Sequence, residues 1–373
     1  MGKFDGFRNF RTTAGNALTT LMNLPTRRQK GSLKVLANEL DLSITTVSRA
    51  LAGYTDVAES TRKRVNDAAD KINYVPNSAG KMLVTGRSGY IGLTLPLMDE
   101  PFSDPFLGDF IAGLGETLAE RGHDLLINTV ATSQSEMQVL RRTVESGRVD
   151  GIVLTRIMQA DERVKFLREQ NMPFVTHGRT LEEQSSYSWI DTDGEFAFSH
   201  ATDLLLSLGH RKLALLSINE HMMFRHVREQ GVSNAIMQSG IKNVSLAIKH
   251  SNRFDQHTYR NVIMRLLSAK NRPTACLALT DEIAITVLEV AAELDLSVPG
   301  DLSVIGFGNI PQAAVVPPGL TTFDQSTRNT AGQLVQVLLD SIDGNTVTQQ
   351  QLIRPHLVSR GSHGEAPMKT GAS

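Results

Sequence analysis

Four hydroxyl side chains and an arginine are clustered between residues 43 and 49, in the run Ser43-Ile-Thr-Thr-Val-Ser-Arg49. Short hydroxyls can donate hydrogen bonds to phosphate oxygens, and an arginine can reach the edge of a base with its forked N–H groups. The residue types in this run therefore suit phosphate and base-edge contacts. The surrounding chain has to provide an element that presents them together.

The residues around this run predict two short helices joined by a tight turn. The apolar residues of the first helix recur at helical spacing: Leu33, Leu36, Ala37 and Leu40. Asp41 and Leu42 interrupt the pattern, and Ser43 suits the N-cap of a second helix. Val47 and Leu51 would bury that helix and leave its polar residues outside. This is the layout of a helix-turn-helix DNA-binding unit, although an ordinary pair of helices has the same pattern.

A longer motif distinguishes these two interpretations. Its residues are Leu36-Ala37, Thr46-Val47-Ser48-Arg49-Ala50-Leu51, Val57, Thr61-Arg62, Val65 and Asn73-Tyr74-Val75-Pro76-Asn77. On these residues the chain resembles the lactose-repressor (LacI/GalR) family of bacterial transcription regulators. The resemblance extends over roughly residues 32 to 361.

The resemblance implies a set of DNA-contacting residues in the head. Ile44, Thr45 and Arg49 occupy the base-reading positions, and Ser43, Thr46 and Ser48 suit phosphate contacts; Asn77 also belongs to this set. Two departures from the family are visible. Asp41 stands where a small residue, often Gly, is usual, and Asp tolerates a left-handed backbone better than most residues. Ile44 can press on a thymine methyl group but cannot hydrogen-bond a base.

Residues 76–88 resemble the hinge helix of this family, which forms when two subunits sit on the operator. Leu83 matches the apolar wedge that opens a minor-groove step. Gly80 lies in the middle of this helix, where Gly costs ~1 kcal/mol relative to Ala, and so favours a segment that folds on binding. Residues 1–31 are interpreted as a mobile basic arm or the product of a mis-chosen start codon, and residues 32–75 as the DNA-binding head.

The charge distribution agrees with a basic DNA-binding head joined to an acidic body. Residues 1–88 contain 14 Lys and Arg against 7 Asp and Glu, whereas residues 89–373 contain 24 against 32. A basic segment of this kind is the electrostatic footprint of nucleic-acid binding. A chain of 373 residues is also too long for one core, so two or three domains are expected.

From residue 89 the pattern alternates between strands and helices. The predicted strands are 90–95, 125–129, 151–155, 174–176, 212–217, 246–250, 275–279, 303–307 and 320–323. The predicted helices are 106–121, 134–146, 194–208, 225–239, 256–269, 282–294 and 327–342. Strict alternation predicts an α/β fold with parallel sheets. The length of residues 89–361 suits two such lobes, which resemble periplasmic sugar-binding proteins, with three chain crossings near residues 190–191, 323–325 and 349–352.

A cleft between these lobes is the predicted binding site for a small-molecule effector. Ligands of parallel α/β sheets bind beyond the carboxyl ends of the strands, and several polar and aromatic residues fall there. The resemblance implies that Arg228 contacts the effector and that the ring of Phe254 packs against it. The candidates are Phe102, Asp104, Arg156, His177, Arg228, Phe254, Asn309 and Gln325. Donors and rings together suit a neutral polyhydroxyl ligand. Gly308-Asn309 replaces the acidic pair common in the family. We therefore do not assign to this chain the effector of any well-known family member.

Catalysis is not expected. Gly113-Leu114-Gly115 and Gly306-Phe307-Gly308 lack the third glycine and the strand–turn–helix context of a dinucleotide site. No metal or cofactor motif is present, and one cysteine, Cys276, excludes an internal disulfide. The chain also has no convincing signal peptide and no apolar run near the ~20 residues of a membrane span, so a cytoplasmic protein is expected.

The sequence therefore predicts a transcription regulator, interpreted as a repressor of carbohydrate uptake or catabolism, that binds a pseudo-palindromic operator. A sugar-type effector would control it from the cleft, and whether the effector loosens or tightens DNA binding stays open. Residues 362–373 are predicted to be a disordered tail. Because they lack leucine heptads, a dimer is expected rather than a tetramer. The alternative is a soluble cytoplasmic sugar-binding protein without DNA function.

Overall fold

The helical pattern before residue 72 and the strand–helix alternation after residue 89 fold as two separate units, Met1–Arg87 and Ser88–Ser373. The computed structural model describes residues 32–51, 53–72, 74, 86–96, 105–130, 135–182, 186–251, 256–345 and 347–368. The predicted arm, residues 1–31, lies outside these ranges, as does the predicted hinge up to residue 85.

The head contains three helices: α2 (Leu33–Leu40), α3 (Ile44–Leu51) and α4 (Glu59–Lys71). The hydroxyl of Ser32 caps α2 by accepting a hydrogen bond from the Val35 amide at 3.2 Å. Asp41 adopts φ 52° in the turn, so the left-handed backbone expected there is present. The helices bury one small core, in which Leu36, Val47 and Val65 are fully inaccessible.

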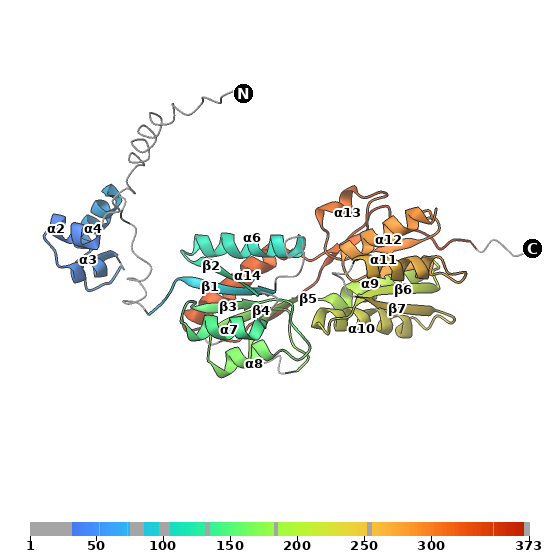
Figure 1. Ribbon diagram of the computed structural model, residues 1–373, viewed down its shortest axis with the longest axis horizontal. Coiled ribbons are helices and arrows are strands. Elements are labelled where there is room, and N and C mark those ends of the chain that lie inside the picture. The colour runs from blue at the N-terminus through green and yellow to red at the C-terminus, as the bar shows by residue number, and fades with distance from the viewer. Residues whose placement is uncertain are drawn as a thin grey trace, which may run out of the picture. The chain divides into compact units, whose positions relative to one another are not determined.

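The first lobe of the second unit is a six-stranded parallel sheet with the order β11-β5-β4-β3-β1-β2. Its strands are β1 (Tyr90–Pro96), β2 (Asp124–Val130), β3 (Gly151–Leu154), β4 (Phe174–His177), β5 (Ser188–Thr192) and β11 (Gln350–Ile353). Helices α6 (Pro105–Glu120) and α14 (Thr327–Ile342) pack together on one face, and α7 (Glu136–Glu145) and α8 (Glu162–Glu169) cover the other (Figure 1).

The second lobe has a four-stranded parallel sheet with the order β7-β6-β8-β9. Its strands are β6 (Lys212–Ile218), β7 (Ser245–Ser251), β8 (Ala275–Ala278) and β9 (Ser303–Ile305). Its helices are α9 (Gly194–Ser207), α10 (Met223–Gln238), α11 (Gln256–Leu267), α12 (Asp281–Glu293) and the short α13 (Pro311–Val315). β10 (Thr322–Asp324) and β12 (His356–Val358) form a separate antiparallel pair. The chain passes between the lobes after β5, after β10 and after β11, near the three predicted crossings.

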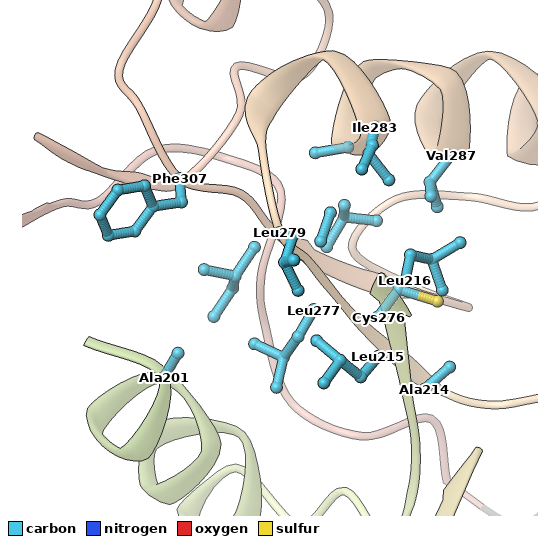
Figure 2. Packing of buried hydrophobic residues seen from close by; sticks show 14 of the residues in the cluster. Ala201, Ala214, Leu215, Leu216, Cys276, Leu277, Leu279, Ile283, Val287 and Phe307 are labelled. Atoms are coloured by element: carbon cyan, nitrogen blue, oxygen red, sulfur yellow. The ribbon is translucent and has the colours of Figure 1, made fainter. Parts of the chain in front are cut away.

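The core of the second lobe explains why its strands are continuous apolar runs in the sequence. Both faces of a parallel sheet are covered by helices, so neighbouring side chains on one strand are all buried. Cys276 and Leu277 on β8 are buried against Leu215 and Leu216 of β6 (Figure 2). Burial raises the pKa of the Cys276 thiol to about 12, so this cysteine is an inert part of the core, as expected.

The structure contains elements that local pattern did not predict, namely α8, β5, α13, β11 and β12. It also differs from the predicted disordered tail. Ser362 is fully buried, and its carbonyl oxygen accepts a hydrogen bond from the Val304 amide at 2.7 Å. The carbonyl of Gly364 lies 3.1 Å from Nε2 of the buried His210. Residues 362–366 are therefore docked on the second lobe, because β9 and its neighbours supply partners for a polar segment that has no apolar periodicity of its own.

Two glycines on α6 provide a direct test of its packing against α14. An added Cβ at Gly113 would clash with the Arg328 carbonyl oxygen and lie 2.9 Å from Ala331 Cβ, whereas one at Gly115 would meet nothing. Gly113→Ala is therefore expected to lower the free energy of unfolding by about 1–3 kcal/mol, as overpacking does. Gly115→Ala is expected to raise it by up to about 1 kcal/mol, because Ala is the better helix former. Urea unfolding of both variants measures the difference, and equal values would contradict the close helix contact.

Candidate functional site

The second helix of the head, α3, is anchored at its first turn by Ser43. The Thr46 amide donates a hydrogen bond to Ser43 Oγ at 3.0 Å, and the two hydroxyl oxygens lie 2.8 Å apart. One of the two hydroxyl protons forms this hydrogen bond, and the other can be donated to an external acceptor such as a phosphate oxygen. The two predicted phosphate-contact residues are thus held side by side.

The outward face of α3 carries the residues predicted to read bases. Val47 and Ala50 are buried in the head core, whereas Thr45 is exposed and Ile44 is 49% exposed. Ser48 and Arg49 are half-buried at the edge of the same face. The half-exposed Ile44 leaves an apolar surface on this polar face, which suits contact with a thymine methyl group.

Arg49 is oriented by two residues that the sequence pattern did not single out. Its Nη2 forms an ion pair with Asp56, and its guanidinium lies over the ring of Tyr54, 4.6 Å from the ring centroid. Both partners lie in the loop between α3 and α4. Because a mobile arginine side chain loses rotamer freedom when it binds, contacts that restrain its guanidinium beforehand reduce that loss.

Five predicted site residues fall outside the described ranges: Asn77, Leu83, Phe102, Asp104 and Phe254. The structure therefore bears on the remaining candidates alone.

The structure brings four of the predicted effector residues to one cavity between the lobes: Arg156, His177, Arg228 and Gln325. Arg156 and His177 follow β3 and β4 of the first lobe, Arg228 projects from α10 of the second lobe, and Gln325 follows β10 at a crossing. Several lining residues lie inside helices or near a strand end and were not predicted from the sequence: Asp109, Asp191, Phe224, Glu282 and Phe307.

Arg228 occupies a box of aromatic rings on the second-lobe side of the cavity. Its guanidinium carbon lies 3.8 Å from the ring centroid of Phe307 and 4.8 Å from that of Phe224. One guanidinium nitrogen donates a hydrogen bond to the Leu279 carbonyl oxygen at 2.5 Å. A cation stacked on a ring and desolvated in this way is strongly restrained. The arginine therefore presents a fixed donor edge to the cavity.

His177 provides a neutral polar group on the first-lobe side. Its ring lies against Phe106 and Phe110, with centroid distances of 5.3 and 5.4 Å. Burial, aided by the nearby Arg228 charge, lowers its pKa to about 4, so the imidazole is neutral near pH 7. Among the residues the structure describes, Nε2 is buried with no hydrogen-bond partner. A buried polar atom in this state is unfavourable unless a ligand or water satisfies it.

Asp191 is a buried carboxylate at the end of β5, which the sequence marked only as a chain crossing. Burial raises its pKa to about 6, opposed by the charge of Arg179 at 3.6 Å. The Arg179 guanidinium in turn lies over the Trp189 ring, 5.3 Å from its centroid. The cavity thus contains positive, negative and neutral polar groups beside aromatic rings.

Asn309 is placed differently from the other candidates. Its amide nitrogen donates to Asp324 Oδ2 at 2.8 Å, and its amide oxygen accepts from Arg360 at 2.7 Å. The residue adopts φ 52° and is not among the residues that line the cavity. Its side-chain amide therefore joins β10 to the segment after β12 and is not part of the cavity lining.

Asp281 at the start of α12 supports the loop that carries Phe307. Its carboxylate accepts hydrogen bonds from the Ile310 amide at 3.0 Å and the Thr322 hydroxyl at 2.6 Å, and an added Cβ at Gly306 would clash with it. Burial nevertheless raises its pKa to about 6 from an ordinary value of 3.8, although these hydrogen bonds oppose the shift. The Asp281 side chain therefore supports this loop.

The raised pKa of Asp281 predicts a pH effect on stability. Between pH 4 and 6 the native state binds a proton that the unfolded state has released, so the free energy of unfolding falls as pH rises through this window, by up to about 3 kcal/mol. Asp281→Asn should remove this contribution. Urea titrations of both proteins at pH 4.5, 5.5 and 7 test this, and parallel pH profiles would refute it.

No group of three or more His, Cys, Asp or Glu residues that could hold a metal occurs in the described ranges. In that same part of the chain, no helix is both long and apolar enough to cross a bilayer.

Comparisons with known proteins agree with this architecture. Residues 32–77 match the model of the bacterial regulatory proteins of the lacI family, and residues 202–363 match the periplasmic binding protein-like domain. The transcriptional regulator AglR of Rhizobium meliloti is 34% identical over 342 residues, which is 90% of this chain and 95% of that protein. RafR of Escherichia coli is 30% identical and is matched over 90% and 99% of the two chains.

Two solved structures extend the comparison to the fold. A complex of the transcriptional regulator CelR with cellobiose superimposes with a TM-score of 0.68 at 25% identity, over 89% of this chain and all of that one. The Lac repressor dimer bound to operator and the anti-inducer ONPF superimposes with a TM-score of 0.75 at 21% identity, over 90% and 99% of the two chains.

A helix-turn-helix head joined to a two-lobed body of the periplasmic-binding type defines a ligand-controlled class of DNA-binding protein. The chain belongs to the lacI family of bacterial regulatory proteins and is a helix-turn-helix transcription regulator, not an enzyme. The alternative of a sugar-binding protein without DNA function is set aside, because the match includes the whole three-helix head.

Proposed function

We propose that this regulator is a dimeric repressor of genes for carbohydrate uptake or catabolism, acting in the cytoplasm on a pseudo-palindromic operator. Two copies of a helix-turn-helix head bind two half-sites related by the symmetry of the dimer. A sugar-type effector binds between the lobes and changes the affinity for the operator. The relatives support a sugar, since one of them, CelR, was solved with cellobiose.

The observation that carries the effector proposal is the composition of the cavity. It combines the rings of Phe106, Phe224 and Phe307 with polar groups that converge from both lobes. Sugar rings offer apolar faces to aromatic side chains and hydroxyls that both donate and accept hydrogen bonds. Neutral His177 and charged Arg228 and Asp191 match the second property, and the mixture of charges disfavours a ligand with a large net charge.

The experiment is a thermal-shift screen of the full chain against glucose, galactose, ribose, maltose, cellobiose, sucrose and raffinose. A sugar that binds the native state alone raises the unfolding temperature by mass action. The same sugar should then shift a gel-retardation curve on an operator selected from randomised duplexes. No stabilisation by any sugar, together with unaltered operator binding, would overturn the effector class.

A further inference from the structure

Besides the covalent crossings, the two lobes are joined by a short seam of backbone hydrogen bonds. The Met223 amide donates to the Ile157 carbonyl oxygen at 2.9 Å, and the Gln159 amide donates to the His221 carbonyl oxygen at 3.2 Å. Between these bonds, Met158 and Met222 form an isolated antiparallel bridge. We call residues 157–159 and 221–223 the interlobe seam.

Apolar packing accompanies these hydrogen bonds. Met222 is buried in the core of the second lobe, and Met158, which comes from the first lobe, packs against the same core. Ile157 is buried in the core of the first lobe. Separation of the lobes at this point would break both hydrogen bonds and expose methionine surface to water.

The first-lobe side of the seam is held by the buried Arg163 on α8. Its Nη2 donates to the carbonyl oxygens of Thr155 and Arg156 at 3.1 and 3.0 Å. Its charge is balanced by Asp161 at 2.7 Å and Glu136 at 2.5 Å. Asp161 in turn accepts a hydrogen bond from the Met158 amide at 3.0 Å. One guanidinium thus fixes the loop that follows β3, where Arg156 adopts φ 56°.

Both sides of the seam also border the cavity. Ile157 and Met223 of the seam line it, together with their neighbours Thr155, Arg156 and Phe224. A ligand in the cavity therefore contacts the same two segments whose backbones are bonded to each other. Ligand binding and seam formation involve one set of residues, so each should favour the other.

We propose that the interlobe seam holds the cleft in its binding geometry before the effector arrives, and that Arg163 is the positioning residue that keeps the seam in register. The expected effect of the seam on ligand affinity rests on the proposed effector function, whereas the hydrogen-exchange test of the seam does not. If seam opening makes the cleft incompetent, the apparent affinity for the effector falls with the fraction of molecules in which the seam is formed.

Met223 allows one seam hydrogen bond to be removed selectively. It is the first residue of α10, where an amide has no partner within the helix and proline is tolerated. The preceding Met222 has ψ 146°, which is compatible with a following proline. Met223→Pro removes the donor to Ile157, whereas Met223→Ala shortens the side chain and keeps the donor. The difference between the two variants isolates the hydrogen bond.

The primary measurement is hydrogen exchange of residues 156–161 in the full, ligand-free chain. In Met223→Pro this segment should exchange about tenfold faster than in Met223→Ala, with exchange of the β6 and β8 core unchanged. Whichever sugar of the thermal-shift panel stabilises the wild type should bind Met223→Pro about three- to tenfold more weakly than Met223→Ala. Equal exchange in the two variants would overturn the proposal. If no sugar stabilises the wild type, the effector proposal fails while the exchange experiment still decides the seam.

Arg163→Lys tests the positioning residue itself. Lysine keeps the charge but cannot donate to two carbonyl oxygens and two carboxylates at once. Faster exchange of residues 156–161 is expected, with exchange of the β6 and β8 core unchanged. Arg168→Lys on the exposed end of the same helix is the matched control and should leave this segment at the wild-type rate. Wild-type exchange in Arg163→Lys would remove Arg163 from the positioning role.

Discussion

Arg228→Ala is expected to abolish the response at effector concentrations that half-saturate the wild type, while operator binding in the absence of effector is retained. The guanidinium is buried on three aromatic rings and presents a fixed donor edge to the cavity. A hydrogen bond to a charged group contributes about 1.5–3 kcal/mol, so one lost contact weakens effector binding by roughly 10- to 150-fold. Truncation also leaves a space beside the Phe307 ring, where the guanidinium had packed.

The measurement is operator release as a function of sugar concentration. Arg225→Ala is a matched control, because Arg225 lies one turn earlier on α10 and binds Glu229 at 2.9 Å and the Asn219 carbonyl oxygen at 2.9 Å. Arg225 is not among the residues that line the cavity, so this variant should respond as the wild type does. A wild-type response from Arg228→Ala would remove Arg228 from the effector site.

Arg49→Ala is expected to lower operator affinity by about 1–3 kcal/mol and to relax sequence choice at one base pair of each half-site. The physical reason is that a fork restrained by Asp56 and Tyr54 on the outward face of α3 suits a base edge better than a mobile side chain does. Asp56→Asn should give a smaller loss in the same direction, because the ion pair is exposed and contributes little by itself.

Binding to the selected operator and to its single-base variants separates base reading from general charge effects. Lys63→Ala removes the same charge from the exposed side of α4 and should weaken operator and non-specific DNA alike. In an Arg49→Ala background, Asp56→Asn should have no further effect on sequence choice. An Arg49→Ala protein that ranks the operator variants as the wild type does would show that the arginine binds phosphate rather than a base.

Local sequence was sufficient for the head. Helical spacing from Leu33 to Leu40, an N-cap at Ser43 and a second helix through Val47 are short-range signals, and the structure has helices at these positions. The same holds for the body, where predicted strands and helices such as 327–342 recur within a few residues of their observed bounds. These elements follow from periodicity within one segment, which is why no knowledge of the remaining chain was needed.

Strands that form by pairing with distant segments could not be predicted from local sequence. β11 has mostly exposed residues and no alternation, and it is a strand because its backbone pairs with β5, about 160 residues earlier. The segment 362–366 is ordered because Val304 and His210 supply partners for its carbonyl oxygens. Pairing of this kind depends on the sheet edge that the folded lobe presents, and no local pattern encodes it.

The sequence by itself determined a helix-turn-helix head, two parallel α/β lobes and a group of polar residues at the carboxyl ends of their strands, because each of these rests on residues close together in the chain. Only the tertiary structure decided which side chains share the cavity. It brought Arg156, His177, Arg228 and Gln325 together, added Asp191 and the rings of Phe224 and Phe307, and placed the Asn309 side chain against Asp324 and Arg360. Orientation, desolvation and the interlobe seam depend on atoms that meet through space from both lobes, and these are set by packing rather than by sequence spacing.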